Sequence, residues 1–215
     1  MELITKETIQ SWDRFYRGNF INSLSGYKSV SLIATTNKKN QPNLAIFSNI
    51  VHLGADPALI AFVNRPREAA PHTLKNIEET GFYTINHIHP DMVLRAHQTS
   101  AKYPDDVSEF DAVALKPDYI QGFSVPFVKE SKCSYAMKLV EVTPIKHNNT
   151  YFVIGEVQQV RLEGSIIRND GFLQLDKIET VASLGIDAYY NPQPLARYSY
   201  AKPGVIATNL SEFSV

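Results

Sequence analysis

Residues 29–63, SVSLIATTNKKNQPNLAIFSNIVHLGADPALIAFV, contain the pattern that decides the fold class. Apolar residues alternate with their neighbours over 30–35, the polar turn 37–42 follows, and residues 43–51 are predicted to form the returning strand. Residues 58–63 have the length and the flanking turn signals of a buried strand. Strands that follow one another directly, with no long helix between them, indicate antiparallel pairing.

The rest of the chain indicates a mainly β fold with added short helices. A helical segment is predicted at 1–27, interrupted near Gly18 and Gly26, and an irregular tail at 192–215. Residues 100–116 are predicted to be a polar surface excursion. The other expected elements are a loop at 53–57, helices at 71–81, 90–97, 108–111 and 176–184, and strands at 82–86, 132–142 and 151–162. This order predicts a single domain, residues 1–215, built as an antiparallel barrel and not as a parallel doubly wound sheet.

Composition excludes several classes of protein. The 215 residues are 44% hydrophobic and 20% charged, which is enough apolar content for a packed core, and the net charge is -1. This balance argues against nucleic acid or an anionic membrane as the main partner. No apolar run approaches the ~20 residues of a membrane span, and the first residues lack the features of a secretory signal. The sequence therefore predicts a soluble cytoplasmic protein.

Common catalytic and metal-binding motifs are absent from the sequence. There is no Gly-x-Gly-x-x-Gly or Walker-type loop and no Gly-x-Ser-x-Gly nucleophile turn. Cys133 stands alone within a predicted strand, where it is expected to be a small core or interface residue. His87, His89 and His97 have a spacing found in metal sites, but no carboxylate completes the set, so no metal is expected.

The segment from Asn43 to Asn49 has unusually small and polar residues for a strand. Asn43, Ala45 and Ser48 stand where large or β-branched residues are usual. Such a strand can lie under a flat polar ring and offer it backbone N–H and C=O groups. An ordinary edge strand with one solvated face explains the composition equally well.

A second segment, residues 65–76, has the composition of an anion site. Arg65, His72, Thr73 and Lys75 surround the predicted start of a helix. Free N–H groups and the helix dipole favour an anion there, and arginine can hold it with two hydrogen bonds. Alternatively, Thr73 is the N-cap of the helix and the cations belong to a solvated loop.

Taken in order, these segments resemble the flavin reductase-like proteins with the FMN-binding split-barrel fold. The resemblance covers about residues 25–200. Its first motifs are Thr35-Thr36, Asn43-Leu-Ala-Ile-Phe-Ser48, Asp56-Pro57, Asn64-Arg65-Pro66, His72-Thr-Leu-Lys-Asn-Ile77 and Glu79-Thr-Gly-Phe-Tyr-Thr-Ile-Asn86. Later motifs are Ser100, Ser108-Glu-Phe110, Pro126 with Glu130-Ser131 before Cys133, Gly155-Glu-Val157, and Leu184-Gly185 before Tyr189.

The resemblance implies a homodimer of antiparallel six-stranded barrels with one FMN per subunit near the interface. By position, Asn43, Ala45, Ile46, Phe47 and Ser48 would run beside the isoalloxazine ring and the ribityl chain. Asn64, Arg65, His72, Thr73 and Asn76 would surround the phosphate, and Ser100, Ala101 and Lys102 would close over the flavin from the partner subunit. Many members have an acidic residue where this chain has His72.

The function implied by the resemblance is an NAD(P)H-dependent flavin reductase. FMN is the expected flavin, with FAD as the second choice, and NADH or NADPH is the expected hydride donor. No side chain is expected to act as acid, base or nucleophile, because the flavin carries the redox chemistry. A monooxygenase is an expected partner, and the tyrosines of the C-terminal stretch (Tyr189, Tyr190, Tyr198 and Tyr200) are expected at the dimer interface. Two alternatives remain: an FMN-binding electron carrier or flavin store without NAD(P)H turnover, and an unrelated β-barrel binding module.

Overall fold

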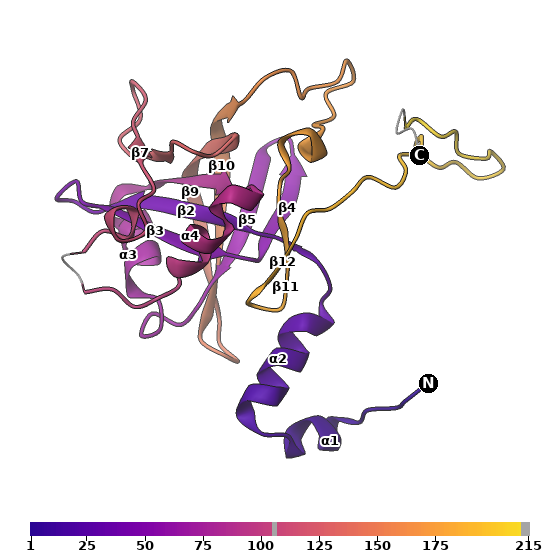
Figure 1. The fold of residues 1–215 in the computed structure, drawn as a ribbon, viewed down its shortest axis with the longest axis horizontal. Helices are drawn as coiled ribbons and strands as arrows, with labels where there is room; N and C mark the ends of the chain where they lie inside the picture. The colour runs from indigo at the N-terminus through magenta and orange to yellow at the C-terminus, as the bar shows by residue number, and fades with distance from the viewer. Residues whose placement is uncertain (105–106, 212–215) are drawn as a thin grey trace.

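A seven-stranded antiparallel sheet forms the body of the protein in the computed structural model, which describes residues 1–104 and 107–211 (Figure 1). The strands lie in the order β3-β2-β6-β9-β10-β5-β4. Their bounds are β2 Ser31–Thr36, β3 Pro42–Phe47, β4 Ile50–Ala55, β5 Ala58–Asn64, β6 Phe82–His87, β9 Cys133–Ile145 and β10 Thr150–Leu162. The predicted fold class is therefore confirmed, although this sheet has seven strands in the described residues where six were expected.

Two small sheets and several short helices complete the fold. One small sheet contains β1 Lys28–Ser29, β11 Ala182–Leu184 and β12 Ala188–Tyr190, and the other contains β7 Pro117–Asp118 and β8 Phe127–Val128. The helices are α1 Lys6–Ser11, α2 Arg14–Leu24, α3 Pro71–Thr80, η1 Pro90–Met92, α4 Val93–Gln98, α5 Glu109–Ala112 and η2 Leu175–Ile178. No helix in the described part of the chain is long and apolar enough to cross a membrane.

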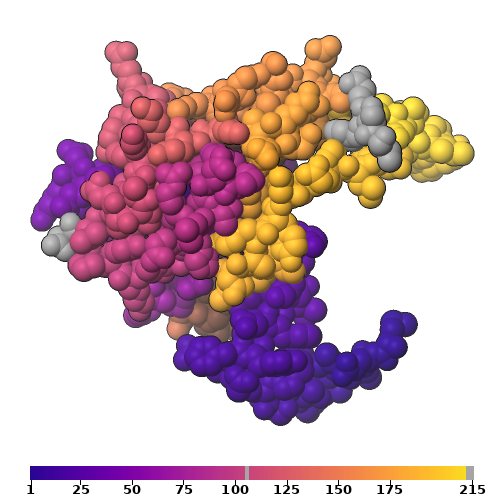
Figure 2. All heavy atoms as spheres, in the orientation of Figure 1, coloured from indigo at the N-terminus to yellow at the C-terminus, as the bar shows by residue number. Residues whose placement is uncertain are grey.

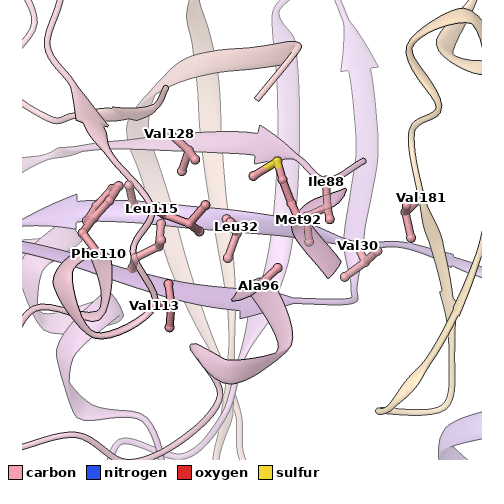
Figure 3. Packing of buried hydrophobic residues seen from close by; sticks show 12 residues of the cluster. Val30, Leu32, Ile88, Met92, Ala96, Phe110, Val113, Leu115, Val128 and Val181 are labelled. Carbon is pink, nitrogen blue, oxygen red and sulfur yellow. The ribbon is translucent and has the colours of Figure 1, made fainter. Parts of the chain in front are cut away.

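Strand β2 is buried along its whole length because it lies between two hydrophobic clusters. The barrel core, on one face, includes Ile33 of β2 together with Phe62, Tyr83 and Leu74. The outer core, on the other face, includes Leu32 of β2 and side chains from the segments that carry α4 and α5 (Figure 3). A strand covered on both faces loses its alternation of polar and apolar residues. The sheet is thus the middle layer between a barrel interior and an outer helical cover.

Helix α3 follows the sequence signals closely. Pro71 is its first residue, where the missing N–H costs nothing. Gly81 ends it with φ 78°, a left-handed conformation that other residues adopt only under strain. Leu74 and Ile77 are fully buried in the barrel core, so the helix is fixed by its packing against the sheet.

Two predicted boundaries near the N-terminus are wrong. Gly18 lies inside α2, and the break in the helical segment occurs before Asp13, whose side chain accepts hydrogen bonds from the N–H groups of Phe15 and Tyr16 and so starts a new helix. The predicted strand 43–51 is divided at Ser48. The reason is topological: β3 pairs with β2 whereas β4 pairs with β5, so the chain must pass from one edge of the sheet to the other.

Two later predictions also need correction. The capping pattern of Asp176 and Glu179 predicts a helix at 176–184, but Glu179 has φ 55° and ends η2 after one turn. The residues that follow form β11, which pairs with β1. The segment 100–116 is more than a surface excursion, because Phe110 and Leu115 are buried in the outer core; residues 105 and 106 lie outside the described part.

His87, at the end of β6, gives the fold a pH dependence. Burial against Thr180 and Tyr135 lowers the pKa of His87 from 6.5 to about 4. The His87 imidazole therefore takes up a proton near pH 6.5 in the unfolded chain but only near pH 4 in the folded chain. This contribution to stability is complete above pH 6.5 and is lost as the pH falls.

We predict that wild-type protein loses about 2 kcal/mol more unfolding free energy between pH 7 and pH 5 than His87→Gln does, since each pH unit below 6.5 is worth about 1.4 kcal/mol. Urea unfolding at the two pH values measures the difference. His147→Gln, a substitution in an exposed turn, is the control and should match the wild type. Equal losses in wild type and His87→Gln would show that His87 is not the source.

Candidate functional site

The outer edge of β3 offers backbone hydrogen bonds that the fold leaves open. β3 is the end strand of the seven-stranded sheet. Leu44 N–H points away from β2 and donates to Glu109 Oε2 at 3.1 Å, while Ser108 Oγ donates to Pro42 C=O at 3.1 Å. Since every second residue of an antiparallel strand faces the same edge, Ile46 also presents its N–H and C=O outward. No residue of the described ranges hydrogen-bonds either group of Ile46.

A chain of buried polar side chains fixes α3 against β2 and β3. Asn43 Nδ2 lies 3.4 Å from Thr73 Oγ1, and Asn76 Nδ2 donates to Thr35 Oγ1 at 3.1 Å. All four residues are buried. Asn43, Thr73 and Asn76, three of the predicted site residues, are therefore brought together, and they position the start of α3 beside the strand.

The N-cap residue of α3 gives the helix no side-chain cap. Its N-cap residue, Ala70, makes no capping hydrogen bond, and Pro71 has no N–H. The first N–H groups of the helix are therefore those of His72 and Thr73. The alternative in which Thr73 caps the helix is wrong, because Thr73 lies inside the first turn. An uncapped helix start with its positive dipole end is a suitable place for an anionic group.

Two arginines near this helix have different roles. Arg67 donates to both carboxylate oxygens of Glu78, at 2.8 and 2.6 Å, and its guanidinium lies 4.7 Å from the ring centroid of Tyr151. Glu78 therefore raises the pKa of Arg67 above its ordinary value. Arg65 is exposed and forms no ion pair with any described residue. The charge of Arg65, unlike that of Arg67, is available to an anion.

Asn64 and Glu109 are two buried polar residues near this helix and strand edge. Asn64 is fully buried; its Nδ2 donates to Arg65 C=O at 2.7 Å, but its Oδ1 has no partner in the described residues. Burial raises the pKa of Glu109, and the N–H groups of Leu44 and of Glu109 itself and the charge of His72 oppose that rise. Glu109 was not among the predicted site residues, although Ser108-Glu109 was noted as the start of a helical turn. The residues next to Glu109 in the sequence do not indicate that its carboxylate reaches the edge of β3.

The remaining predicted residues are only partly assembled. Ala45, Ile46 and Phe47 of β3 and Ser48 just after it are all half-buried, and the Phe47 ring packs against Phe62 with centroids 4.9 Å apart. Ser100, Ala101 and Lys102 are exposed after the end of α4. Helix α4, which precedes them, contacts β3.

Other candidates lie elsewhere. His97 Nδ1 and Tyr189 Oη are 2.8 Å apart, and His89 Nε2 is 3.1 Å from Glu130 C=O, so the three histidines of the sequence pattern do not converge. The described residues contain no group of three metal-ligating side chains. Two surface hollows include none of the predicted site residues. One is lined by residues 168–170, 174 and 177, and the other by residues 129–132 and 161–163. The candidate site is thus an open strand edge beside a helix start.

Comparison with known families agrees with this geometry. A family model described as a flavin reductase like domain matches residues 24–175. The chain belongs to the flavin reductase-like family. The matched region contains β3, α3, α5 and every predicted site residue. Membership makes the chain a flavin-binding oxidoreductase, and the resemblance inferred from the sequence is confirmed.

Solved structures share the same architecture. A candidate flavin reductase with a split-barrel domain from Shewanella frigidimarina is 45% identical, with a TM-score of 0.90, covering 94% of this chain and 100% of that one. Nitrilotriacetate monooxygenase component B from Bacillus cereus is 18% identical, with a TM-score of 0.79 and coverage of 91% and 97%. Flavoredoxin from Desulfovibrio vulgaris is 23% identical, with a TM-score of 0.67 and coverage of 83% and 91%. The last two share the fold alone.

Proposed function

We propose that the protein binds FMN at the edge of β3 and uses NADH or NADPH to reduce it. The observation that carries this proposal is the start of α3, whose N-cap residue provides no cap, together with Arg65, which forms no ion pair with a described residue. In this arrangement the N–H groups of His72 and Thr73, together with Arg65, hold the terminal phosphate. FMN is favoured over FAD because a terminal phosphate presents more charge to this cluster than a bridging pyrophosphate does.

The residues present suit a flavin in two further respects. The open N–H and C=O groups of Ile46 offer the ring a donor and an acceptor side by side, and Asn64 Oδ1 is a buried acceptor with no partner among the described residues. Bound FMN would accept a hydride from the nicotinamide and pass electrons onward. The protein's contribution is to orient the ring and hold its phosphate, which is why the site needs no side-chain acid or base.

Assembly and partner complete the proposal. Ser100, Ala101 and Lys102, which are exposed in one chain, reach the flavin of the second subunit in a homodimer. The likeness of fold to nitrilotriacetate monooxygenase component B supports a monooxygenase as the recipient of reduced flavin. An electron carrier, as the likeness of fold to flavoredoxin suggests, would bind FMN but would not oxidise NADH or NADPH.

The proposed activity is tested by the visible spectrum of the FMN-loaded protein under anaerobic conditions. We predict that the oxidised flavin bands bleach within seconds to minutes of adding NADH or NADPH, much faster than free FMN under the same conditions. Dithionite, which reduces any accessible flavin, is the positive control. A spectrum that stays oxidised with both nucleotides but bleaches with dithionite would leave an FMN-binding electron carrier and exclude the reductase.

Arg65→Ala tests the phosphate site, with Arg67→Ala as its matched control. Loss of one charge-assisted hydrogen bond costs about 1.5–3 kcal/mol, so the dissociation constant for FMN should rise about tenfold to hundredfold, while that for riboflavin should hardly change. Arg67→Ala should leave the ratio of the two constants unchanged, because Glu78 already neutralises Arg67. Flavin fluorescence titration measures all four constants. Equal weakening of FMN and riboflavin by Arg65→Ala would show that Arg65 acts on the fold.

A further inference from the structure

The N-terminal arm, residues 1–27, has the surface of a helix that packs against something the single chain does not supply. Neither α1 nor α2 buries a single residue. Yet Tyr16, Phe20 and Leu24 follow one another at intervals of four residues and so form an apolar stripe on α2. Trp12 extends the stripe, with its ring centroid 4.9 Å from Tyr16 and 5.0 Å from Phe20.

The arm contacts the body of the protein near the end of the arm. Lys28 Nζ donates to Asn22 C=O at 2.9 Å and to Gly185 C=O at 3.2 Å, and the Tyr27 ring lies 4.8 Å from that of Tyr190. Beyond this joint α2 and α1 extend away from the barrel (Figure 1). Figure 2 shows the arm and the C-terminal tail, residues 191–211, standing out on the same side of the molecule with a hollow between them.

Helix stability argues that the stripe is covered in solution. Helix α2 has 11 residues, and isolated helices of fewer than about 12–15 residues are marginal in water. Its interior glycine, Gly18, weakens it further. Within its own chain the helix packs against Trp12 on one side and buries no residue fully, so we expect further packing to come from another surface.

The area and the charge of the chain identify that surface. The chain exposes 13525 Å², whereas a compact monomer of 24.2 kDa exposes about 10,000 Å². A typical obligate homodimer interface buries about 2,000–5,000 Å² in total, or about 1,000–2,500 Å² on each subunit. The excess of about 3,500 Å² per chain is larger than this contribution of one subunit. A net charge of -1 allows two copies to approach without strong repulsion.

We propose that the N-terminal arm clasps a second copy of this chain. The apolar stripe of α2 packs on the partner subunit, and the two arms exchange about a two-fold axis, the commonest symmetry of soluble oligomers. This inference extends the proposed homodimer by assigning its clasp, and it does not depend on flavin, so it can fail while the proposed activity stands.

Trp12 makes the arm directly observable, because it is the only tryptophan in the sequence. In the FMN-loaded protein at about 20 µM we predict a dimer by sedimentation, with blue-shifted tryptophan emission that iodide quenches poorly. Dilution until the dimer dissociates should shift the emission to the red and restore quenching. Emission maximum and quenching are used in place of intensity because bound flavin also quenches fluorescence.

Two substitutions in the stripe test its role against a matched exposed tyrosine. Tyr16 is 58% and Leu24 is 67% exposed in the single chain, and Tyr119, on a different surface, is 52% exposed. Tyr16→Arg and Leu24→Arg should each raise the dimer dissociation constant about tenfold for each of the two arms, and so about a hundredfold overall. Tyr119→Arg should leave it unchanged. Thermal melts confirm that the barrel of each variant remains folded.

Three results would overturn the proposal. One is a wild-type dimer in which Trp12 is as quenchable as free N-acetyltryptophanamide. Another is a monomer with a shielded Trp12, which would mean that the arm folds back on its own barrel. The third is a pair of stripe variants that dimerise as tightly as the wild type while remaining folded.

Discussion

The outward-facing backbone groups of β3 are the constraint on which the site depends. A strand at the edge of a sheet presents unpaired N–H and C=O groups, and most proteins cover or block them. Here the start of α5 covers one part of the edge, through Glu109 and Ser108, and stops before Ile46. The helix start of α3 lies beside the same strand because Asn43 and Asn76 hold it there. A planar polar ring with a phosphate at one end matches an open edge next to an uncapped helix.

Much of the fold was predictable from residue patterns. Turn residues and alternating runs identified the central strands, and Pro71 and Gly81 gave the bounds of α3 almost to the residue. The failures occurred where long-range pairing overrides local propensity. Asp176 and Glu179 form a plausible capping box, but the strand pairing of Ala182 and Ser183 with Ser29 and Lys28 requires extended backbone there. Likewise, nothing local to Ser48 reveals that the chain changes sheet edges at that point.

The residue types of the site could be predicted from the sequence, but the role of each charged residue could not. The sequence placed Arg65, His72 and Lys75 around the helix start, but charge alone does not show which cations in this region are already paired. Only the structure shows that Glu78 neutralises Arg67 and that Arg65 remains available. Glu109 was missed for a similar reason, because its partner, Leu44 N–H, is 65 residues away in the chain. The same limit applies to assembly: the apolar stripe on α2 can be read from the sequence, but the fact that no residue of the helix is fully buried within the chain cannot.

Amide hydrogen exchange, followed residue by residue by NMR with and without saturating FMN, tests the central claim most directly. The N–H groups of Ile46, His72 and Thr73 should exchange at least about tenfold more slowly once FMN is bound, because the ring and the phosphate become their acceptors. Leu44 N–H, already bonded to Glu109, should change little and serves as the internal reference. The contradicting result would be that FMN slows amide exchange on other strands while the exchange rates of Ile46, His72 and Thr73 stay the same. The flavin site would then not lie at the edge of β3 and the start of α3.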